Sequence, residues 1–217
     1  MFIGHFAVGF GTKKAAPHVN LGTLFLAAQF LDLLWPVLLL AGVEHVRIRP
    51  DALPFLRIDL YDYPLSHSLV TSILWSILIG LAYYLFKKNI RNAFILGCAV
   101  FSHWVLDFLT HAPDLPLAPG LTPLVGLGLW NSTLATIVIE SALFFLGIFL
   151  YVHTTKAKNR TGVISLWALI IFLVISYLAS IFGPPPPDVA PIGWLGLTMW
   201  LLIPWGYWID RNREYTA

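Results

Sequence analysis

Six long apolar stretches constrain the fold of this 217-residue chain more than any other feature of its sequence. They cover residues 20–43, 65–86, 93–111, 131–152, 162–182 and 192–209. Each has the roughly 17 to 25 residues that an α-helix needs to cross about 30 Å of hydrocarbon. Their apolar residues run continuously instead of alternating, which favours helices over a membrane β-barrel. Because only 11% of the residues are charged, against about 25% in a soluble domain, we expect a polytopic membrane protein.

The first 14 residues are apolar until Lys13 but too short to span, and we interpret them as a half-helix that returns into the membrane. They lack a leading basic segment and a small-residue cleavage site, so a removable signal peptide is not expected. The predicted fold class is all-α: a polytopic membrane helical bundle of six transmembrane helices plus this N-terminal re-entrant half-helix. We treat residues 1–217 as a single integral membrane domain, in which residues 1–125 carry the motifs and residues 131–210 form accessory helices.

The basic residues gather in short clusters at helix ends, and these clusters predict the orientation. One set comprises Lys13, Lys14, Lys87, Lys88, Arg91, Lys156, Lys158, Arg160, Arg211 and Arg213. By the positive-inside rule this set and the C-terminus are cytoplasmic, so we expect a multi-pass protein of a bacterial or archaeal cytoplasmic (inner) membrane. Three arginines in the outward 44–64 connection oppose this orientation, and acidic residues there offset them in part. The scattered charges, with a net value of +2, exclude a nucleic-acid surface.

Ionisable side chains inside the spans indicate function, because an Asp at a helix centre costs roughly 2.5 to 3.5 kcal/mol to insert. His103, Asp107 and His111 follow one another at intervals of four, which places them on one face of a helix. At about 1.5 Å per residue, Asp32 on the first span lies at the same depth as His103, and His5 on the half-helix lies near it. Imidazole and carboxylate groups in one layer suit zinc, manganese or iron.

Two further residues extend this layer. His67 enters it from the outer end of the second span, and Glu140 lies midway along the fourth. A hydrogen bond in helix packing is an equal alternative for Glu140, as is a position at the membrane surface for His111. The sequon at residues 131–133 is interpreted as a helix cap, and the single Cys98 as a packing residue.

The order of the segments GHFAVGFG, QFLDLLWP, SHSLV and FSHWVLDFLTH resembles the YdjM-like, LexA-binding family of inner-membrane, metal-dependent hydrolases. The resemblance covers about residues 1–125 and implies metal ligands at His5, Asp32, His67, His103 and Asp107. More distantly, this order is similar to that of the zinc-dependent phospholipase C and single-strand nuclease superfamily, which acts on phosphoesters. The chain departs from these patterns by carrying Leu34 in place of a second Asp, and by lacking the superfamily's later His-x-x-x-Glu.

The leading hypothesis is a membrane-embedded metal-dependent hydrolase that acts on a lipid or lipid-linked phosphoester in the outer half of the membrane. We expect one or two divalent ions, zinc first and manganese second, with membrane lipids as partners and no identifiable protein partner. The predicted catalytic residues are Asp32, His67 and Asp107. The predicted metal ligands are His5, Asp32, His67, His103 and Asp107, with His111 and Glu140 as further candidates.

Two other classes of function compete with this hypothesis. A transporter or channel would use the intramembrane His and Asp residues as a proton or metal relay. Polar groups should then continue to the cytoplasmic face, whereas the spans below His5 and Asp32 are mainly apolar. A non-catalytic membrane anchor for a cytosolic partner is the third class, and the short cytoplasmic connections give it no independent support.

Overall fold

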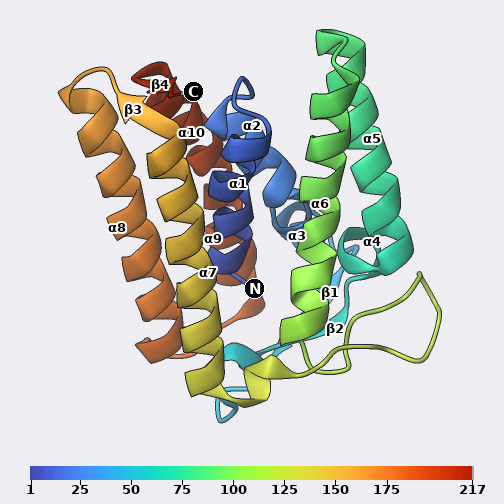
Figure 1. Ribbon diagram of the computed structural model, residues 1–217. Helices are drawn as coiled ribbons and strands as arrows, with labels where there is room; N and C mark the ends of the chain where they lie inside the picture. The colour runs from blue at the N-terminus through green and yellow to red at the C-terminus, as the bar shows by residue number, and fades with distance from the viewer. Residues whose placement is uncertain (217) are drawn as a thin grey trace.

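Long helices account for most of the chain in the computed structural model, which describes residues 1–216 (Figure 1). The helices are α1 (Ile3–Ala15), α2 (Leu21–Ala28), α3 (Phe30–Leu40), α4 (Pro64–His67), α5 (Leu69–Lys87), α6 (Ile90–Thr110), α7 (Thr133–Thr154), α8 (Arg160–Phe182), α9 (Val189–Leu197) and α10 (Leu202–Arg211). The strands are β1 (His45–Ile48), β2 (Ile58–Asp62), β3 (Thr155–Ala157) and β4 (Arg213–Tyr215). The prediction of a helical membrane bundle is therefore confirmed in outline.

Five helices are long and apolar enough to cross a membrane, and a sixth span arises only if the bent pair α2 and α3 is counted as one. The last of the five is the continuous segment Val189–Arg211, which includes α9 and α10. The axes of α2 and α3 differ by 58° because Gln29 leaves the helical conformation, with φ −102° and ψ 5°. The first predicted span is thus broken close to Asp32.

The second span begins later than predicted, and His67 does not belong to it. Pro64 starts the separate short helix α4, and Ser68 then adopts an extended conformation with ψ 154°. The Ser68 side chain accepts a hydrogen bond from the Thr71 amide, which caps the first turn of α5. The chain turns at this cap, so His67 reaches the bundle from a connection.

Two small sheets correct the expectation of an all-α chain. Strands β1 and β2 pair antiparallel in the 44–64 connection, where Arg49, just after β1, donates from Nε and Nη2 to Oδ2 of Asp59 on β2. Strands β3 and β4 join the end of α7 to the end of the chain. With three residues each, β3 and β4 are too short to show an apolar alternation. Strands β1 and β2 do alternate, with Val46, Ile48, Ile58 and Leu60 packed in one apolar cluster, so this sheet had a usable signal in the sequence. Ser132 caps α7 as predicted, by accepting from the Ala135 amide.

Helix α1 lies inside the bundle, against α7, α2 and α6. A Cβ added to Gly147 on α7 would come within 2.5 Å of the Ala7 carbonyl oxygen, so a glycine is needed where α7 meets α1. At the other end of α1, Lys13 forms a buried ion pair with Asp210 at 2.5 Å, and Tyr151 donates to the same carboxylate. These contacts fix the half-helix at both ends. The end of α1 that leads to α2, strands β3 and β4 and the α5–α6 turn lie at the same end of the bundle (Figure 1).

Candidate metal centre

Five predicted ligands from four helices meet in the interior of the bundle. Helix α1 supplies His5, α3 supplies Asp32, α4 supplies His67, and α6 supplies His103 and Asp107. Within the described residues, two sets of three have ligand atoms within 4.8 Å of one another: His5 with His103 and Asp107, and Asp32 with His67 and His103. His103 belongs to both sets, so the sets adjoin.

The carboxylate of Asp107 connects the imidazoles. Its Oδ1 lies 3.0 Å from Nε2 of His5 and 3.8 Å from Nε2 of His111, and the amino nitrogen of Met1 lies 2.6 Å from the same oxygen. Its Oδ2 lies 3.3 Å from Nε2 of His103 and 3.8 Å from Nε2 of His67. Each oxygen thus faces a different group of nitrogen atoms, and Asp107 contacts members of both sets although only His103 belongs to both.

Asp32 is the accessible member of the cluster. Its Oδ1 lies 3.4 Å from Nε2 of His67 and 3.5 Å from Nε2 of His103. Its side chain is 25% exposed, whereas that of Asp107 is 1% exposed. A molecule that approaches the cluster therefore meets Asp32 before Asp107.

The bend between α2 and α3 orients His103. Because the helix breaks after Ala28, the carbonyl oxygen of Ala28 is available to a neighbour, and Nδ1 of His103 lies 2.9 Å from it. A carbonyl oxygen can only accept, so Nδ1 carries the proton. The neutral ring then has its lone pair on Nε2, which is buried and has no hydrogen-bond partner.

A chain of two side chains orients His67 in the same way. Glu44, which is fully buried, accepts hydrogen bonds from the Leu65 and Ser66 amides and from the Ser66 hydroxyl at 2.6 Å. Since the hydroxyl gives its only proton to Glu44, it accepts from Nδ1 of His67, 2.7 Å away. The Nε2 lone pair of His67 is therefore directed at Asp32 and Asp107.

The carboxylate of Asp114 orients His111, which is buried at the C-terminal end of α6. Its Nδ1 lies 2.9 Å from Oδ1 of Asp114, and the Tyr63 hydroxyl donates to the same oxygen at 3.1 Å. Burial and the Asp114 carboxylate raise the pKa of Tyr63 well above its ordinary value of 10.0, so its hydroxyl keeps the proton that it donates. Nε2 of His111 is left facing Asp107.

The donor set fits a divalent metal ion. Three neutral imidazoles would present Nε2 lone pairs to carboxylate oxygens, so acceptors would face acceptors at 3.3 to 3.8 Å. A cation among them, or a second proton on each ring, removes this repulsion. Metal-binding histidines usually donate the other ring N–H to a carbonyl or carboxylate, as these rings do directly or through Ser66.

Comparison with known proteins identifies the family to which the chain belongs. Residues 63–183, more than half of the chain, match the model of the YdjM inner membrane protein family. The chain belongs to that family. No curated protein and no solved structure gives a match. The YdjM match differs from the expected extent of residues 1–125, because it begins after α3 and runs to the end of α8.

The YdjM match includes His67, His103, Asp107 and His111, and it leaves out the His5 and Asp32 segments. The cluster is thus built from both the matched region and the helices that precede it. Family membership supports an inner-membrane location, and the ligand set depends on the geometry alone.

Glu140 lies in the YdjM match but in neither ligand set. Its Oε2 accepts a hydrogen bond from the Phe2 amide at 3.1 Å, next to the first turn of α1. The open amide groups of a helix N-terminus favour a carboxylate, so this contact fits the packing alternative for Glu140. The hydroxyl of Ser102, which precedes His103, returns to the Ala99 carbonyl of its own helix.

Sequence reasoning missed the residues that orient the imidazoles: Glu44, Tyr63, Ser66 and Asp114. Asp114 follows His111 by three residues and Ser66 directly precedes His67, so proximity was a usable signal for these two. Glu44 and Tyr63 lie in a connection where polar residues are ordinary, so the sequence gives no sign of their burial. Gln29, at the α2–α3 break, is also buried with both side-chain polar atoms unpartnered.

Proposed function

We propose that this YdjM-family protein is a membrane-embedded metal-dependent hydrolase that acts on a lipid or lipid-linked phosphoester. The observation that carries the proposal is the convergence of three imidazole Nε2 atoms on Asp32 and Asp107, with each Nδ1 engaged by an acceptor behind it. Such an arrangement fixes each ring in the tautomer that a metal requires.

The ligand sets suggest where one or two ions would bind. His5, His103 and Asp107 form one set, and Asp32, His67 and His103 form the other. Nε2 of His111 lies 3.8 Å from Oδ1 of Asp107, but His111 belongs to neither set. Zinc suits these nitrogen and oxygen donors best, and manganese is the second choice. When bound, such ions make water a nucleophile at neutral pH and stabilise negative charge on phosphoryl oxygens.

The protein's own groups supply the remaining requirements of hydrolysis. Asp32 retains exposure at the edge of the cluster, so its carboxylate is suited to orient an incoming water and to accept its proton. Asp107 and His103 are fully buried and hold their positions through several contacts, which suits them to a fixed electrostatic role. A site enclosed by membrane-type helices favours a substrate that is itself dissolved in the bilayer.

The main alternative is a proton or metal relay through the bundle. An apolar cluster that includes Ala16, Leu24, Leu31, Leu96 and Val100 packs α2, α3 and α6 together on the side of the basic helix ends. Val100 and Leu96 precede His103 on α6 by about one and two turns, respectively, so they separate the ligand sets from that end. A one-sided site of this kind supports hydrolysis over transport.

Metal analysis of the purified protein tests the proposal. We expect one to two equivalents of zinc or manganese, and loss of that metal in the double variant His103→Ala with Asp107→Ala. The matched control is His18→Ala with Asp51→Ala, which removes the same two residue types at exposed positions. Equal metal content in both double variants would show that the assigned site is wrong.

Measurements on the variant Asp32→Asn distinguish the hydrolase hypothesis from the relay hypothesis. The change is nearly isosteric, so we expect the protein to fold while hydrolysis of phospholipids or polyprenyl phosphates falls by about 10²-fold. A relay would show ion flux in proteoliposomes that the variant abolishes. Absence of metal-dependent turnover, together with such flux, would exclude the hydrolase.

A further inference from the structure

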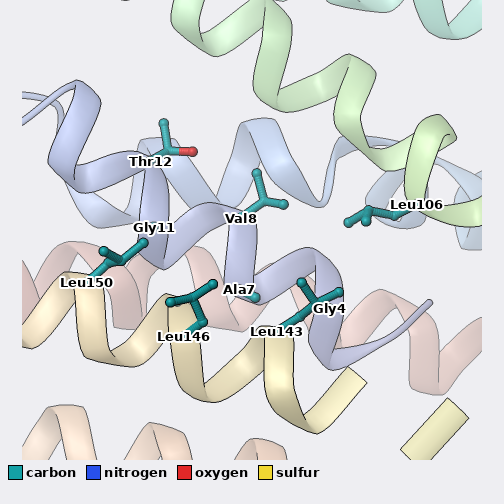
Figure 2. Close-up of a pocket in the computed structure, with 10 residues that line it drawn as sticks. Gly4, Ala7, Val8, Gly11, Thr12, Leu106, Leu143, Leu146 and Leu150 are labelled. Atoms are coloured by element: carbon teal, nitrogen blue, oxygen red, sulfur yellow. The ribbon is translucent and has the colours of Figure 1, made fainter. Parts of the chain in front are cut away.

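Helix α1 carries His5 into the ligand cluster, but one flank of this helix is loosely packed. A groove with a volume of about 300 Å³ opens between α6 and α7, and α1 forms its floor (Figure 2). Val8 and Gly11 line this floor. Of the described atoms on other helices, only Cδ1 of Leu150 would come within 4 Å of a Cβ at Gly11, at an ordinary 3.5 Å. Close packing on this flank therefore does not fix the position of α1 along its axis.

The flank that faces α7 allows close approach but offers little resistance to sliding. Gly147 of α7 lies directly against the backbone of Ala7, where a Cβ would come within 2.5 Å of the Ala7 carbonyl oxygen. A glycine permits this approach because it has no side chain. For the same reason it contributes no group that would interlock with α1 and oppose a shift along the helix axis. Other contacts must then set how far α1 reaches into the bundle.

A buried ion pair at the far end of α1 supplies such a contact. Nζ of Lys13 lies 2.5 Å from Oδ2 of Asp210 on α10, and it donates to the Val19 carbonyl oxygen at 2.8 Å. The two charged side chains are 7% and 6% exposed. The Leu21 amide donates to the same Oδ2 at 2.9 Å, and the Tyr151 hydroxyl donates to Oδ1 at 2.6 Å. The Asp210 carboxylate thus joins α1 to α2, α7 and α10.

This ion pair tolerates little movement of α1. A shift of the helix by one residue corresponds to about 1.5 Å along its axis and about 100° of rotation. Such a shift would separate Lys13 from Asp210 and leave two charges unpaired in a site that is closed to water, which is strongly unfavourable. The helix is continuous from Ile3 to Ala15, so the pair also fixes His5, about 12 Å away along the axis.

We propose that Lys13 and Asp210 are positioning residues for the metal centre, because their ion pair holds α1 at the depth at which His5 meets Asp107. Nε2 of His5 lies 3.0 Å from Oδ1 of Asp107, and its ring stacks on that of His103 with 3.4 Å between the centroids. Ligands must be held within about 0.5 Å of their working positions, so a shift of about 1.5 Å removes His5 from its set.

This inference rests on the proposed metal centre and gives the C-terminal helices a role in it. Both ligand sets among the described residues come from α1, α3, α4 and α6. Helices α7 and α10 act on these sets through Tyr151 and Asp210, which hold the end of α1 opposite to His5.

Variants of the pair test this role without touching a candidate ligand. Lys13→Met and Asp210→Asn each remove one charge at nearly constant size, whereas Lys13→Arg retains the charge. Arg213→Met is the matched control, because Arg213 is buried at the same end of the bundle and donates to Thr155. Its guanidinium lies 5.4 Å from the centre of the Tyr151 ring. Its loss therefore disturbs the surroundings of the pair but removes no hydrogen bond from Asp210.

The first readout is the absorption spectrum of cobalt(II) added to metal-free protein in detergent, because its d–d bands report the number and geometry of the ligands. Lys13→Met and Asp210→Asn should give the spectrum of His5→Ala and weaken cobalt binding by about 10 to 100-fold. Wild type, Lys13→Arg and Arg213→Met should share one spectrum. A purely structural ion pair would lower the unfolding temperature and leave the cobalt spectrum unchanged, and that result would overturn the proposal.

The second readout follows the position of α1 without a metal. Gly11 and Leu150 lie beside each other in Figure 2, so Gly11→Cys with Leu150→Cys, in a chain without Cys98, should form a disulfide on mild oxidation. Loss of either charge of the pair should slow this reaction by about tenfold or more. Tyr151→Phe removes one donor to Asp210 and no charge, so it should slow the reaction less. Equal rates in all these variants would overturn the proposal.

The two readouts distinguish this role from the proposed function. Cobalt binding with one spectrum in every variant of the pair would reject the positioning role and retain the metal centre. Slower disulfide formation in a protein that binds no cobalt would reject the metal centre and leave the pair as a structural contact. If neither charge variant is monodisperse in detergent, Tyr151→Phe carries both readouts: a changed spectrum with slower disulfide formation supports the proposal, and wild-type values in both overturn it.

Discussion

Replacing Ser66 with alanine isolates the orientation of one imidazole from every other property of the cluster. The Ser66 hydroxyl connects Glu44 to His67. Its oxygen lies 2.6 Å from Oε2 of Glu44 and 2.7 Å from Nδ1 of His67. Ser66→Ala removes this oxygen and adds no charge or bulk. Nδ1 of His67 then loses its acceptor, so the proton can move to Nε2 and occupy the lone pair that a metal needs.

The size of the effect follows from the two atoms that lose their partner, Nδ1 of His67 and Oε2 of Glu44, while Oε1 of Glu44 keeps the Leu65 and Ser66 amides. An unsatisfied buried polar group costs about 1 to 3 kcal/mol, so we expect the unfolding free energy of Ser66→Ala to fall by at least this amount. Loss of a group that orients a metal ligand typically weakens metal binding by about 10 to 100-fold. The combined signature is lower stability and weaker zinc binding with every candidate ligand still present.

The assay is a zinc titration of metal-free protein in detergent, with a competing chelator of known affinity. Ser72→Ala is the matched control, because Ser72 is equally buried and its hydroxyl has no hydrogen-bond partner. Truncation of this unpartnered hydroxyl should leave zinc affinity unchanged. Equal zinc affinities in the two variants would refute the role assigned to the Glu44 and Ser66 chain.

Three further predictions follow from the same structure. Chelation of the metal should lower the unfolding temperature in detergent, because a ligand at 100 times its Kd stabilises the folded state by about 2.7 kcal/mol; an unchanged temperature would exclude a tightly held ion. Gly147→Ala should cost about 1 to 3 kcal/mol, because its Cβ would overlap the Ala7 backbone and push α1 away; a wild-type melting curve would contradict this packing. In a variant without the native cysteine, a thiol at Gly120 should react with an impermeant reagent in intact cells while one at Asn159 should not; the reverse result would invert the orientation.

The convergence of the candidate ligands within the spans could be predicted from the sequence, because an ionisable side chain inside a membrane is costly and therefore conspicuous. His103 and Asp107 share a helical face at a spacing of four, and that local relation survives in α6. Asp32 and His5 were added by counting residues from the basic helix ends, and both lie at the cluster. Counting residues from the basic helix ends placed these side chains together because those ends lie at the same membrane surface. Equal counts therefore correspond to equal depths.

The course of the chain near His67 and Asp32 could not be predicted. Both interruptions, at Gln29 and at Ser68, lie within the stretches 20–43 and 65–86, which are long enough for a continuous span. Each interruption has a use that depends on tertiary structure, since the first frees the Ala28 carbonyl for His103 and the second turns His67 inward. A break of this kind becomes favourable only when a neighbouring helix satisfies the freed backbone group.

Asp32 and Glu44 show why the two parts of the site differ in predictability. Both are acidic, and Glu44 is the more buried of the two. Asp32 interrupts an apolar span, where its insertion cost requires an explanation, whereas Glu44 lies in a connection with other acidic residues and requires none. Burial of Glu44 arises only when the β1–β2 connection folds back over α4, so that the Leu65 and Ser66 amides reach its carboxylate. The candidate metal ligands can therefore be recognised within the spans, while the groups that orient them must be sought among the connections that cover the span ends.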